Sequence, residues 1–352
     1  MNLCRVCGEE KLVSKTLNAC IDCIRKNKND ILSEILNFHA KTRREFNLPE
    51  EIPNSDDGIE CKICGNECRI PKYKFGYCGL RLNDGTKISH IGGTSKAGLL
   101  HWYFDPLPTN CVASWVCEGS KQYGKKNLAV FYQSCSFNCL FCQNWHFREI
   151  NIKRARKISA EELADVVDKE TFCICYFGGD PSTQIIHAIQ TSKIAIEKKG
   201  KVRICWETNG NMNKKFLEIA VKLSLESGGC IKFDLKAYDE NLNIALCGVS
   251  NRKTLENFKF ACRFIDKRPE PPLVIASTLI IPGYIDADEV YKIAKFIRQF
   301  DENIPYSLLA FYPQFYFYDL PTTSRKLMNE CVDAARSAGL KRVHVGNVHL
   351  LN

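Results

Sequence analysis

Cys135, Cys139 and Cys142 lie close together near the middle of the chain, in a C-x₃-C-x₂-C spacing typical of a metal-binding loop. Three thiolates so close in sequence can hold three irons of a cubane iron–sulfur cluster. The fourth iron would then be free to bind a substrate, as the open position of a catalytic metal site is. A zinc site with His146 as a fourth ligand is the alternative, because short cysteine spacings also occur in zinc sites.

The front of the chain carries a second set of cysteines in a four-thiolate pattern, C-x₂-C-x₁₂-C-x₂-C. Its members are Cys4, Cys7, Cys20 and Cys23. This spacing predicts a zinc ribbon or knuckle. A metal bound in such a closed site would stabilise a small subdomain that has too little hydrophobic core to fold alone.

A third set follows a less symmetric pattern, C-x₂-C-x₃-C-x₉-C. Its members are Cys61, Cys64, Cys68 and Cys78. These four thiols are predicted to hold zinc or an auxiliary iron–sulfur cluster. The roles of Cys111 and Cys117 stay open, and either thiol can replace one of the assigned ligands.

Six further cysteines alternate with apolar residues in the strands and helices expected in the rear of the chain. They are Cys173, Cys175, Cys205, Cys230, Cys262 and Cys331. Since buried cysteine usually behaves as a small hydrophobic residue, these six are interpreted as core.

The composition of the whole chain is that of an ordinary globular protein apart from its 20 cysteines in 352 residues. The longest apolar run, near Leu273–Ile281, is too short to span a bilayer, and Glu9, Glu10 and Lys11 interrupt any signal peptide. A cytoplasmic protein is therefore expected, with metal ligands and free thiols instead of disulfides. The net charge of +9 keeps nucleic acid as an alternative partner that is not favoured.

From Asn127 onward, short β-rich runs alternate with longer amphipathic stretches, which is the pattern of βαβ units around a parallel sheet. The expected strands are Leu128–Tyr132, Phe172–Phe177, Val202–Glu207, Cys230–Leu235, Leu273–Ile281, Tyr306–Phe311 and Arg342–Val345. Helices are expected after a capping box at Ser159–Glu162 and near 182–199, 213–226, 252–266, 286–300 and 323–338. This number of units favours an α/β barrel over a doubly wound sheet.

The predicted organisation has four parts. They are a Cys4 zinc-ribbon-like unit at 1–26, a helix and linker at 27–58, a second Cys-rich metal-binding unit at 59–126 and the barrel at 127–352. The helix of the second part is expected over 30–47, from its apolar spacing. Turns and little regular structure are expected over 79–126, which contains Gly92–Gly93, Pro106 and Pro108.

The cysteine loop, with an aromatic residue at Phe141 before its last cysteine, resembles the motif of the radical S-adenosylmethionine superfamily. Further motifs of the rear half resemble the glycyl-radical-enzyme activases, such as the pyruvate formate-lyase activating enzyme. They are Phe177-Gly-Gly-Asp-Pro181, Glu207-Thr-Asn-Gly210, Lys232-Phe-Asp-Leu-Lys-Ala-Tyr-Asp239, Cys247-Gly-Val-Ser-Asn251 and Ile280-Ile-Pro-Gly283. Asp180 stands where the family has Glu. The resemblance implies a partial or near-complete (β/α) barrel.

The front half resembles one subgroup, the AmmeMemoRadiSam-type relatives of those activases. The motifs are Cys61-Lys-Ile-Cys64-Gly-Asn-Glu-Cys68, Gly76-Tyr-Cys78-Gly-Leu-Arg81, Phe141-Cys-Gln-Asn-Trp145, Phe311-Tyr-Pro with Asp319-Leu-Pro321, and Val345-Gly-Asn-Val348. The Cys4–Cys23 unit is not part of that pattern.

The resemblance implies a role for each matching residue. Cys135, Cys139 and Cys142 would bind a [4Fe–4S] cluster, and Phe141 would pack on or near the adenine of S-adenosylmethionine. Gly178, Gly179 and Asp180 would hold the amino group of the cofactor, and the catalytic pair Asp234 and Lys236 would hold its carboxylate and neighbouring polar groups. Glu207 would help to bind the cofactor or a monovalent cation.

Plainer interpretations of these residues stay open. Asp234 and Lys236 share one face of a strand and can form an ordinary salt bridge. The two glycines can mark only a turn, and Phe141 can belong to the core. Cys247 is expected in a loop shared with the activases, where a catalytic thiol is an open alternative.

The activity implied is reductive cleavage of S-adenosylmethionine to a 5′-deoxyadenosyl radical, with ferredoxin or flavodoxin as the reductant. The expected substrate is a protein or peptide. Radical modification of RNA or a small metabolite is one alternative, and a non-catalytic zinc-binding interaction protein is another.

Overall fold

The computed structural model describes residues 2–109, 111–152 and 154–352, and its centre is a parallel sheet with one antiparallel edge strand. The strand order is β14-β13-β12-β11-β10-β9-β8-β7. The parallel strands are β8 (Lys126–Tyr132), β9 (Thr171–Gly178), β10 (Arg203–Thr208), β11 (Ile231–Asp234), β12 (Val274–Ile280), β13 (Tyr306–Ala310) and β14 (Val343–Gly346). All seven expected strands are confirmed within a few residues.

Successive parallel strands are also neighbours in the sheet, so the order never reverses as it does in a doubly wound fold. β14 and β7 (Leu100–Pro106) form its two edges, and the sheet is therefore an open, partial barrel. The prediction of an α/β barrel is confirmed.

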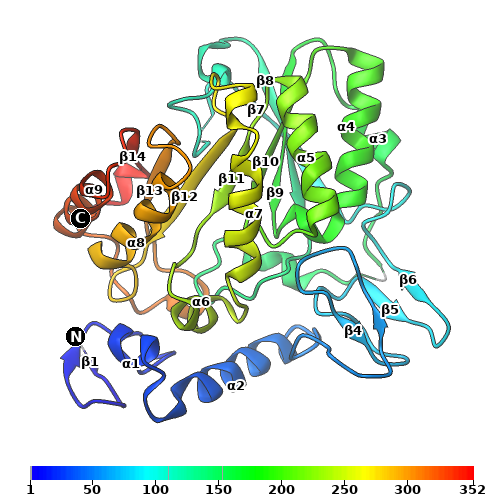
Figure 1. Ribbon diagram of the computed structural model, residues 1–352. Coiled ribbons are helices and arrows are strands. Elements are labelled where there is room, and N and C mark those ends of the chain that lie inside the picture. The colour runs from blue at the N-terminus through cyan, green and yellow to red at the C-terminus, as the bar shows by residue number, and fades with distance from the viewer. Residues whose placement is uncertain (1, 110, 153) are drawn as a thin grey trace.

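Helices connect the strands and cover the outer face of the sheet (Figure 1). They are α3 (Ala160–Asp165), α4 (Ile185–Lys199), α5 (Lys214–Ser227), α6 (Glu240–Cys247), α7 (Arg252–Cys262), α8 (Ala287–Arg298) and α9 (Arg325–Ser337). The capping box of α3 is confirmed, since Ser159 Oγ accepts from the Glu162 N–H and the Glu162 carboxylate accepts from the Ser159 N–H. Helix α6 was not predicted.

The expectation of little regular structure over 79–126 is wrong for β7, which pairs antiparallel with β8 along its whole length. Its aromatic residues suit a half-buried strand, and Pro106 is tolerated because β7 is an edge strand that ends there. The prolines and glycines around the strand masked this signal.

The N-terminal segments run along one end of the sheet, past α6 (Figure 1). They comprise β1 (Asn2–Leu3), β2 (Glu10–Lys11), α1 (Ile21–Arg25), α2 (Ile31–Arg44), β3 (Ile59–Glu60), β4 (Arg69–Ile70), β5 (Arg81–Asn83) and β6 (Ile88–His90). Both α1 and α2 pack on α6, and α2 confirms the helix expected over 30–47. One apolar core runs from Leu17 and Ile35 in this region through the barrel to Leu340.

Among the described residues, no helix combines the length and the apolar character needed to cross a bilayer.

Candidate active site

The cysteine loop directly follows β8, at the carboxyl end of the sheet, where barrel enzymes carry their active sites. Backbone hydrogen bonds fasten it on two sides. The Asp180 N–H donates to Ser134 O over 2.8 Å, and the N–H groups of Asn138 and Leu140 donate to the carbonyls of Cys247 and Leu246 at the end of α6. The three thiols therefore sit on a loop that the barrel itself holds in place.

All the residues expected to bind the cluster or the cofactor line one cavity of about 170 Å³. They are Cys135, Cys139, Phe141, Cys142, Gly178, Gly179, Asp180, Glu207, Asp234 and Lys236. They come from the ends of three neighbouring strands, β9, β10 and β11, and from the loop after β8. Residues more than 100 positions apart in sequence thus converge on one chamber.

The structure does not support the zinc alternative in which His146 is the fourth ligand of the loop. His146 is exposed and stacks on Trp145, with ring centroids 3.9 Å apart. Within the described part of the chain, it joins no compact group of ligand atoms with the three thiols. Burial raises the pKa of Cys135 and Cys142, and a hydrogen bond with Cys247, added to burial, raises that of Cys139. A bound metal would favour the ionised form of these thiols.

Gly178 and Gly179 let the end of β9 approach the cysteine loop closely. Gly178 has φ +83°, and a Cβ there would lie 2.6 Å from the Phe131 ring. A Cβ on Gly179 would lie 2.2 Å from the carbonyl oxygen of Ser134, the residue before Cys135. The glycines are thus required by packing against the loop, in addition to the cofactor role predicted for them.

The carboxylate of Asp180 is buried and already occupied by donors from the protein. It accepts hydrogen bonds from the Ser182 N–H at 2.8 Å, from Thr208 Oγ1 at 3.0 Å and from the Asn209 N–H at 2.7 Å. Burial raises the pKa of Asp180. The side chain joins β9 to β10, and its carboxylate therefore has partners of its own.

Asp234 and Lys236 form the ion pair that their spacing predicts, with Nζ and Oδ2 2.7 Å apart. Ser277 Oγ on β12 donates to the other carboxylate oxygen of Asp234 over 2.7 Å. Burial disfavours the charge of Lys236, but Asp234 and the nearby thiol of Cys139 overcome this and raise its pKa. Lys236 Nζ also lies 5.9 Å from the centre of the Phe141 ring.

Phe141 is buried and packs on Phe317, so it belongs to the core as well as to the cavity wall.

Glu207 lies deeper in the chamber, where its carboxylate pairs with the buried Lys232 at 2.7 Å. Its side chain is 28% exposed and lines both the cavity of the cysteine loop and a second cavity below it. The predicted binding role of Glu207 is therefore compatible with its position, but the residue has a partner of its own.

Arg148 was missed by the sequence analysis because no motif marks it. The residue is only 6% exposed, yet its Nε and Nη1 have no hydrogen-bond partner among the described residues. It lines the cavity of the cysteine loop, and its charge favours the ionised form of both Cys139 and Cys142. A buried cation with free donors at this place suits an anionic ligand.

Asn209 and Cys247 also touch the cysteine loop. The Asn209 amide donates to Cys135 Sγ over 3.6 Å. The motif Glu207-Thr-Asn-Gly210 was the sequence feature that could have indicated this role for Asn209. Cys247 is the last residue of α6, whereas the sequence predicted a loop; it is fully buried and its thiol contacts Cys139. It is not among the residues that line the cavity.

The second Cys-rich unit is hydrogen-bonded to the cysteine loop and its neighbours. Ser134 Oγ donates to Cys78 O over 3.0 Å, and Asn66 Nδ2 donates to Ser136 O over 2.8 Å. Over the described residues, the sulfur atoms of Cys61, Cys64, Cys68 and Cys78 do not form a group within 4.8 Å of one another. Their identity as zinc or cluster ligands stays a prediction.

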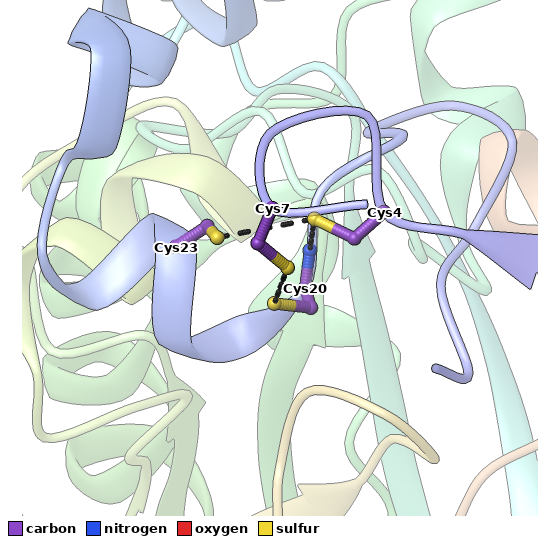
Figure 2. A group of neighbouring side chains, drawn as sticks. All are labelled: Cys4, Cys7, Cys20 and Cys23. Carbon is purple, nitrogen blue, oxygen red and sulfur yellow. Dashed lines mark hydrogen bonds between the residues drawn. The ribbon is translucent and has the colours of Figure 1, made fainter. Parts of the chain in front are cut away.

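The first four-cysteine unit is arranged for a single metal ion. Its four sulfur atoms lie within 4.8 Å of one another, with Cys4 and Cys23 3.9 Å apart and Cys7 and Cys20 3.9 Å apart (Figure 2). Tetrahedral bonds of about 2.3 Å to zinc would separate the sulfurs by about 3.8 Å. Burial opposes the charge of Cys4, but backbone donors, among them the Cys20 N–H, lower its pKa to about 6. The four thiols therefore fit a tetrahedral thiophilic ion, as predicted.

Replacing Cys20 and Cys23 together by serine is expected to release about one metal ion per chain. Leu17, Ala19 and Ile24 belong to the barrel core, and the separate core of this unit consists of little more than the cysteines and Val13. The segment that carries Cys4 and Cys7 should therefore become sensitive to protease while the barrel stays folded. Metal analysis and limited proteolysis would measure both effects. The double Cys262→Ser, Cys331→Ser variant is the control, and an unchanged metal content in the first variant would contradict the assignment.

The chamber of the cysteine loop fits a [4Fe–4S] cluster with one open iron. Among the described residues that line it, the cavity holds three thiols and no fourth cysteine. Arg148, which has two nitrogens without a hydrogen-bond partner among the described residues, lines the same cavity. The donor set thus leaves room for a further ligand, and the surrounding polar groups can hold an amino acid moiety.

Comparison with known proteins points the same way. The family model of the radical S-adenosylmethionine (radical SAM) superfamily matches residues 129–297. The chain is 26% identical over 309 residues to the uncharacterized protein MJ0808 of Methanocaldococcus jannaschii, covering 83% of this chain and 82% of that protein. It is 30% identical over 189 residues to the putative glycyl-radical enzyme activating enzyme MJ1632 of the same organism, covering 52% and 67%. It is 25% identical over 190 residues to the pyruvate formate-lyase 1-activating enzyme of Escherichia coli, covering 52% and 73%.

Proposed function

Because the chain belongs to the radical S-adenosylmethionine superfamily, we propose that this radical enzyme acts on a protein or peptide, as the glycyl-radical-enzyme activases do. The observation that supports the chemistry is the convergence of three thiols and seven predicted cofactor residues on one cavity. The names of two relatives support the class of substrate. The closer kinship with AmmeMemoRadiSam-type proteins is part of this proposal and rests on the front-half motifs alone.

In this proposal, Cys135, Cys139 and Cys142 hold the [4Fe–4S] cluster, and the polar residues of the chamber hold S-adenosylmethionine. When bound, the cluster and cofactor together supply a 5′-deoxyadenosyl radical that abstracts hydrogen. A ferredoxin or flavodoxin is the proposed source of electrons.

The residues of the chain position the cofactor and keep water out. Lys236, held by Asp234, and Arg148, with its free donors, offer two cations to a carboxylate. The backbone at Gly178 and Gly179 can approach an ammonium group because no side chain covers it. Phe141 and Leu279 supply apolar wall. These groups would bind and orient S-adenosylmethionine, and none of them needs to transfer a proton.

A larger cavity beside the chamber provides room for the substrate. Its volume is about 680 Å³, and it is lined by residues of α2, of the second Cys-rich unit and of the cysteine loop. Cys135 and Arg148 line both this cavity and the chamber. A volume of this size is in the range that takes a ligand of several hundred daltons, such as a few residues of a peptide. The N-terminal region would thus form one wall of the substrate site.

The substrate class can be tested by following hydrogen abstraction. Reduced enzyme and unlabelled S-adenosylmethionine are incubated with an extract of cells grown in deuterated medium, and deuterium in 5′-deoxyadenosine is measured by mass spectrometry. Labelling is expected to disappear when the extract is first treated with protease and to persist after nuclease treatment or removal of small molecules.

Other outcomes would assign the alternative substrates. Loss of labelling after nuclease treatment would indicate RNA, and loss after removal of small molecules would indicate a metabolite. Purified protein that contains zinc but no iron or sulfide would contradict the radical activity altogether. The Cys139→Ala enzyme serves as the control for labelling that does not depend on the cluster.

A further inference from the structure

Six cysteines far apart in sequence line a second cavity, of about 120 Å³, inside the barrel. They are Cys111, Cys117, Cys173, Cys175, Cys205 and Cys230. Four of them were interpreted from sequence as ordinary core residues, and two had no assigned role. Cys262 and Cys331, which alternate with apolar residues in the same way, do not line this cavity. The barrel thus gathers one particular subset of its thiols.

The register of the sheet aligns three of these thiols in a row. Cys205 on β10 is the partner of Cys175 on β9, and Cys230 lies opposite Cys205, because the next residues, Trp206 and Ile231, are partners. Neighbouring strands are about 4.8 Å apart, so the three side chains stand next to one another on the inner face. Cys173 lies two residues before Cys175 and shares that face.

The loop between β7 and β8 supplies the two remaining thiols from across the cavity. Cys111 and Cys117 both pack against the cluster of strand cysteines. The loop is anchored on the far side of the barrel, where Trp115 Nε1 donates to Ser307 Oγ over 3.0 Å and Ser307 Oγ donates to Val112 O over 2.9 Å. The cysteines therefore surround the cavity instead of covering one wall.

A buried cation faces these thiols. The side chain of Lys232 is only 1% exposed, and its Nζ donates to Cys111 Sγ over 3.1 Å and to Cys175 Sγ over 3.2 Å. Its third partner is Glu207, at 2.7 Å. A charged amine buried against sulfur is costly unless it is compensated, and it would be compensated by anionic, metal-bound thiolates. Hydrogen bonds to ligand sulfurs are also a common feature of iron–sulfur sites.

The sulfur atoms of the six barrel cysteines are not arranged for a single tetrahedral ion. A tetrahedral zinc site needs its sulfurs about 3.8 Å apart, and the unit of Cys4 and Cys23 meets this condition. Over the described residues, no three of the six barrel thiols lie within 4.8 Å of one another, and neither do those of Cys135, Cys139 and Cys142. Ligands that surround several metal atoms and bridging sulfides must stand further apart, and the cavity between them supplies the room.

We propose that four of these six cysteines hold a second iron–sulfur cluster inside the barrel, below the chamber of the cysteine loop. Phe177 and Glu207 line both cavities, so the two sites would share one interior. Cys230 directly precedes β11 and lies four residues, or about 13 Å of extended chain, before Asp234. The proposal does not depend on the substrate or on the activity proposed above.

Iron and acid-labile sulfide in a variant without the first cluster test this site. The Cys135→Ala, Cys139→Ala, Cys142→Ala chain is purified and reconstituted anaerobically with iron and sulfide. Adding Cys175→Ala, Cys205→Ala and Cys230→Ala is expected to remove a further two to four irons per chain, roughly, with the matching sulfide. Adding Cys262→Ala and Cys331→Ala instead, as the matched control, is expected to remove none.

Three results would overturn the proposal. The first is an iron and sulfide content that the barrel substitutions leave unchanged in folded protein, as judged by circular dichroism. The second is the absence of iron from the reconstituted Cys135→Ala, Cys139→Ala, Cys142→Ala chain. The third is that the barrel substitutions remove zinc and no iron. If the multiple variant does not fold, Cys205→Ser in the same background replaces it. A changed electron paramagnetic resonance signal of the reduced protein is then expected, and an unchanged signal would equally overturn the proposal.

Discussion

The Cys139→Ala enzyme is expected to form 5′-deoxyadenosine more than about 100-fold more slowly than the unmodified enzyme, since even outer partners of a metal site are commonly worth about 10–100-fold. Cys139 lines the chamber together with Cys135 and Cys142, and the loop contains no other thiol to replace it. Chromatography of the products after anaerobic reduction with dithionite measures the rate. Iron analysis should show that the cluster is lost in parallel.

Cys262→Ala is the matched control for this prediction. Cys262 is a buried cysteine at the end of α7 and lines none of the cavities described above. Its truncation should cost some stability and leave the product rate within a few fold. Equal rates for Cys139→Ala and the unmodified enzyme would refute the assignment of the cluster.

Gly179→Ala is expected to reduce the same activity by about 100-fold or more, because displacing catalytic groups by about 1 Å can have that effect. The added Cβ would lie 2.2 Å from Ser134 O and 2.7 Å from Ser134 C, which are backbone atoms and cannot rotate away. The cysteine loop must therefore shift, and overpacking of this kind also costs roughly 1–3 kcal/mol of stability. Product formation and thermal unfolding would be measured together.

Gly200→Ala separates this effect from the general cost of adding a methyl group. Gly200 has φ +73°, and an added methyl group there would meet nothing within 4 Å, so its substitution strains the backbone without a collision. Its cost should be about 1 kcal/mol of stability with little change in rate. A Gly179→Ala enzyme as active as Gly200→Ala would show that the loop does not depend on close packing at β9.

The seven parallel strands could be predicted because each is a short apolar run bounded by turns, and the helices between them have their own period. Helix α6 and strand β7 could not. Helix α6 is short and is stabilised by contacts with α1 and α2, and β7 is an edge strand whose pairing with β8 comes from tertiary structure. Local pattern carries little information on such elements.

The cysteine-loop residues were predicted from type and spacing, and the structure brings them into one cavity. Arg148 could not be predicted in this way. A single arginine in a sequence is usually a solvated surface residue, and only its burial without described partners for Nε and Nη1 distinguishes it. Asp180 shows the reverse, since its motif indicated a ligand for the cofactor and its carboxylate is engaged with Ser182, Thr208 and Asn209.

The fold class, the cysteine loop and the four-thiol unit at the front could be predicted from the sequence, because the hydrophobic period and short ligand spacings are local properties of a chain. Which of the scattered cysteines meet depends instead on the tertiary structure. Cys175, Cys205 and Cys230 have the same alternating pattern as any buried strand residue, and their meeting depends on the lateral register of three strands. Register is set by the packing of both faces of the sheet and by the connecting helices, which no short stretch of sequence contains.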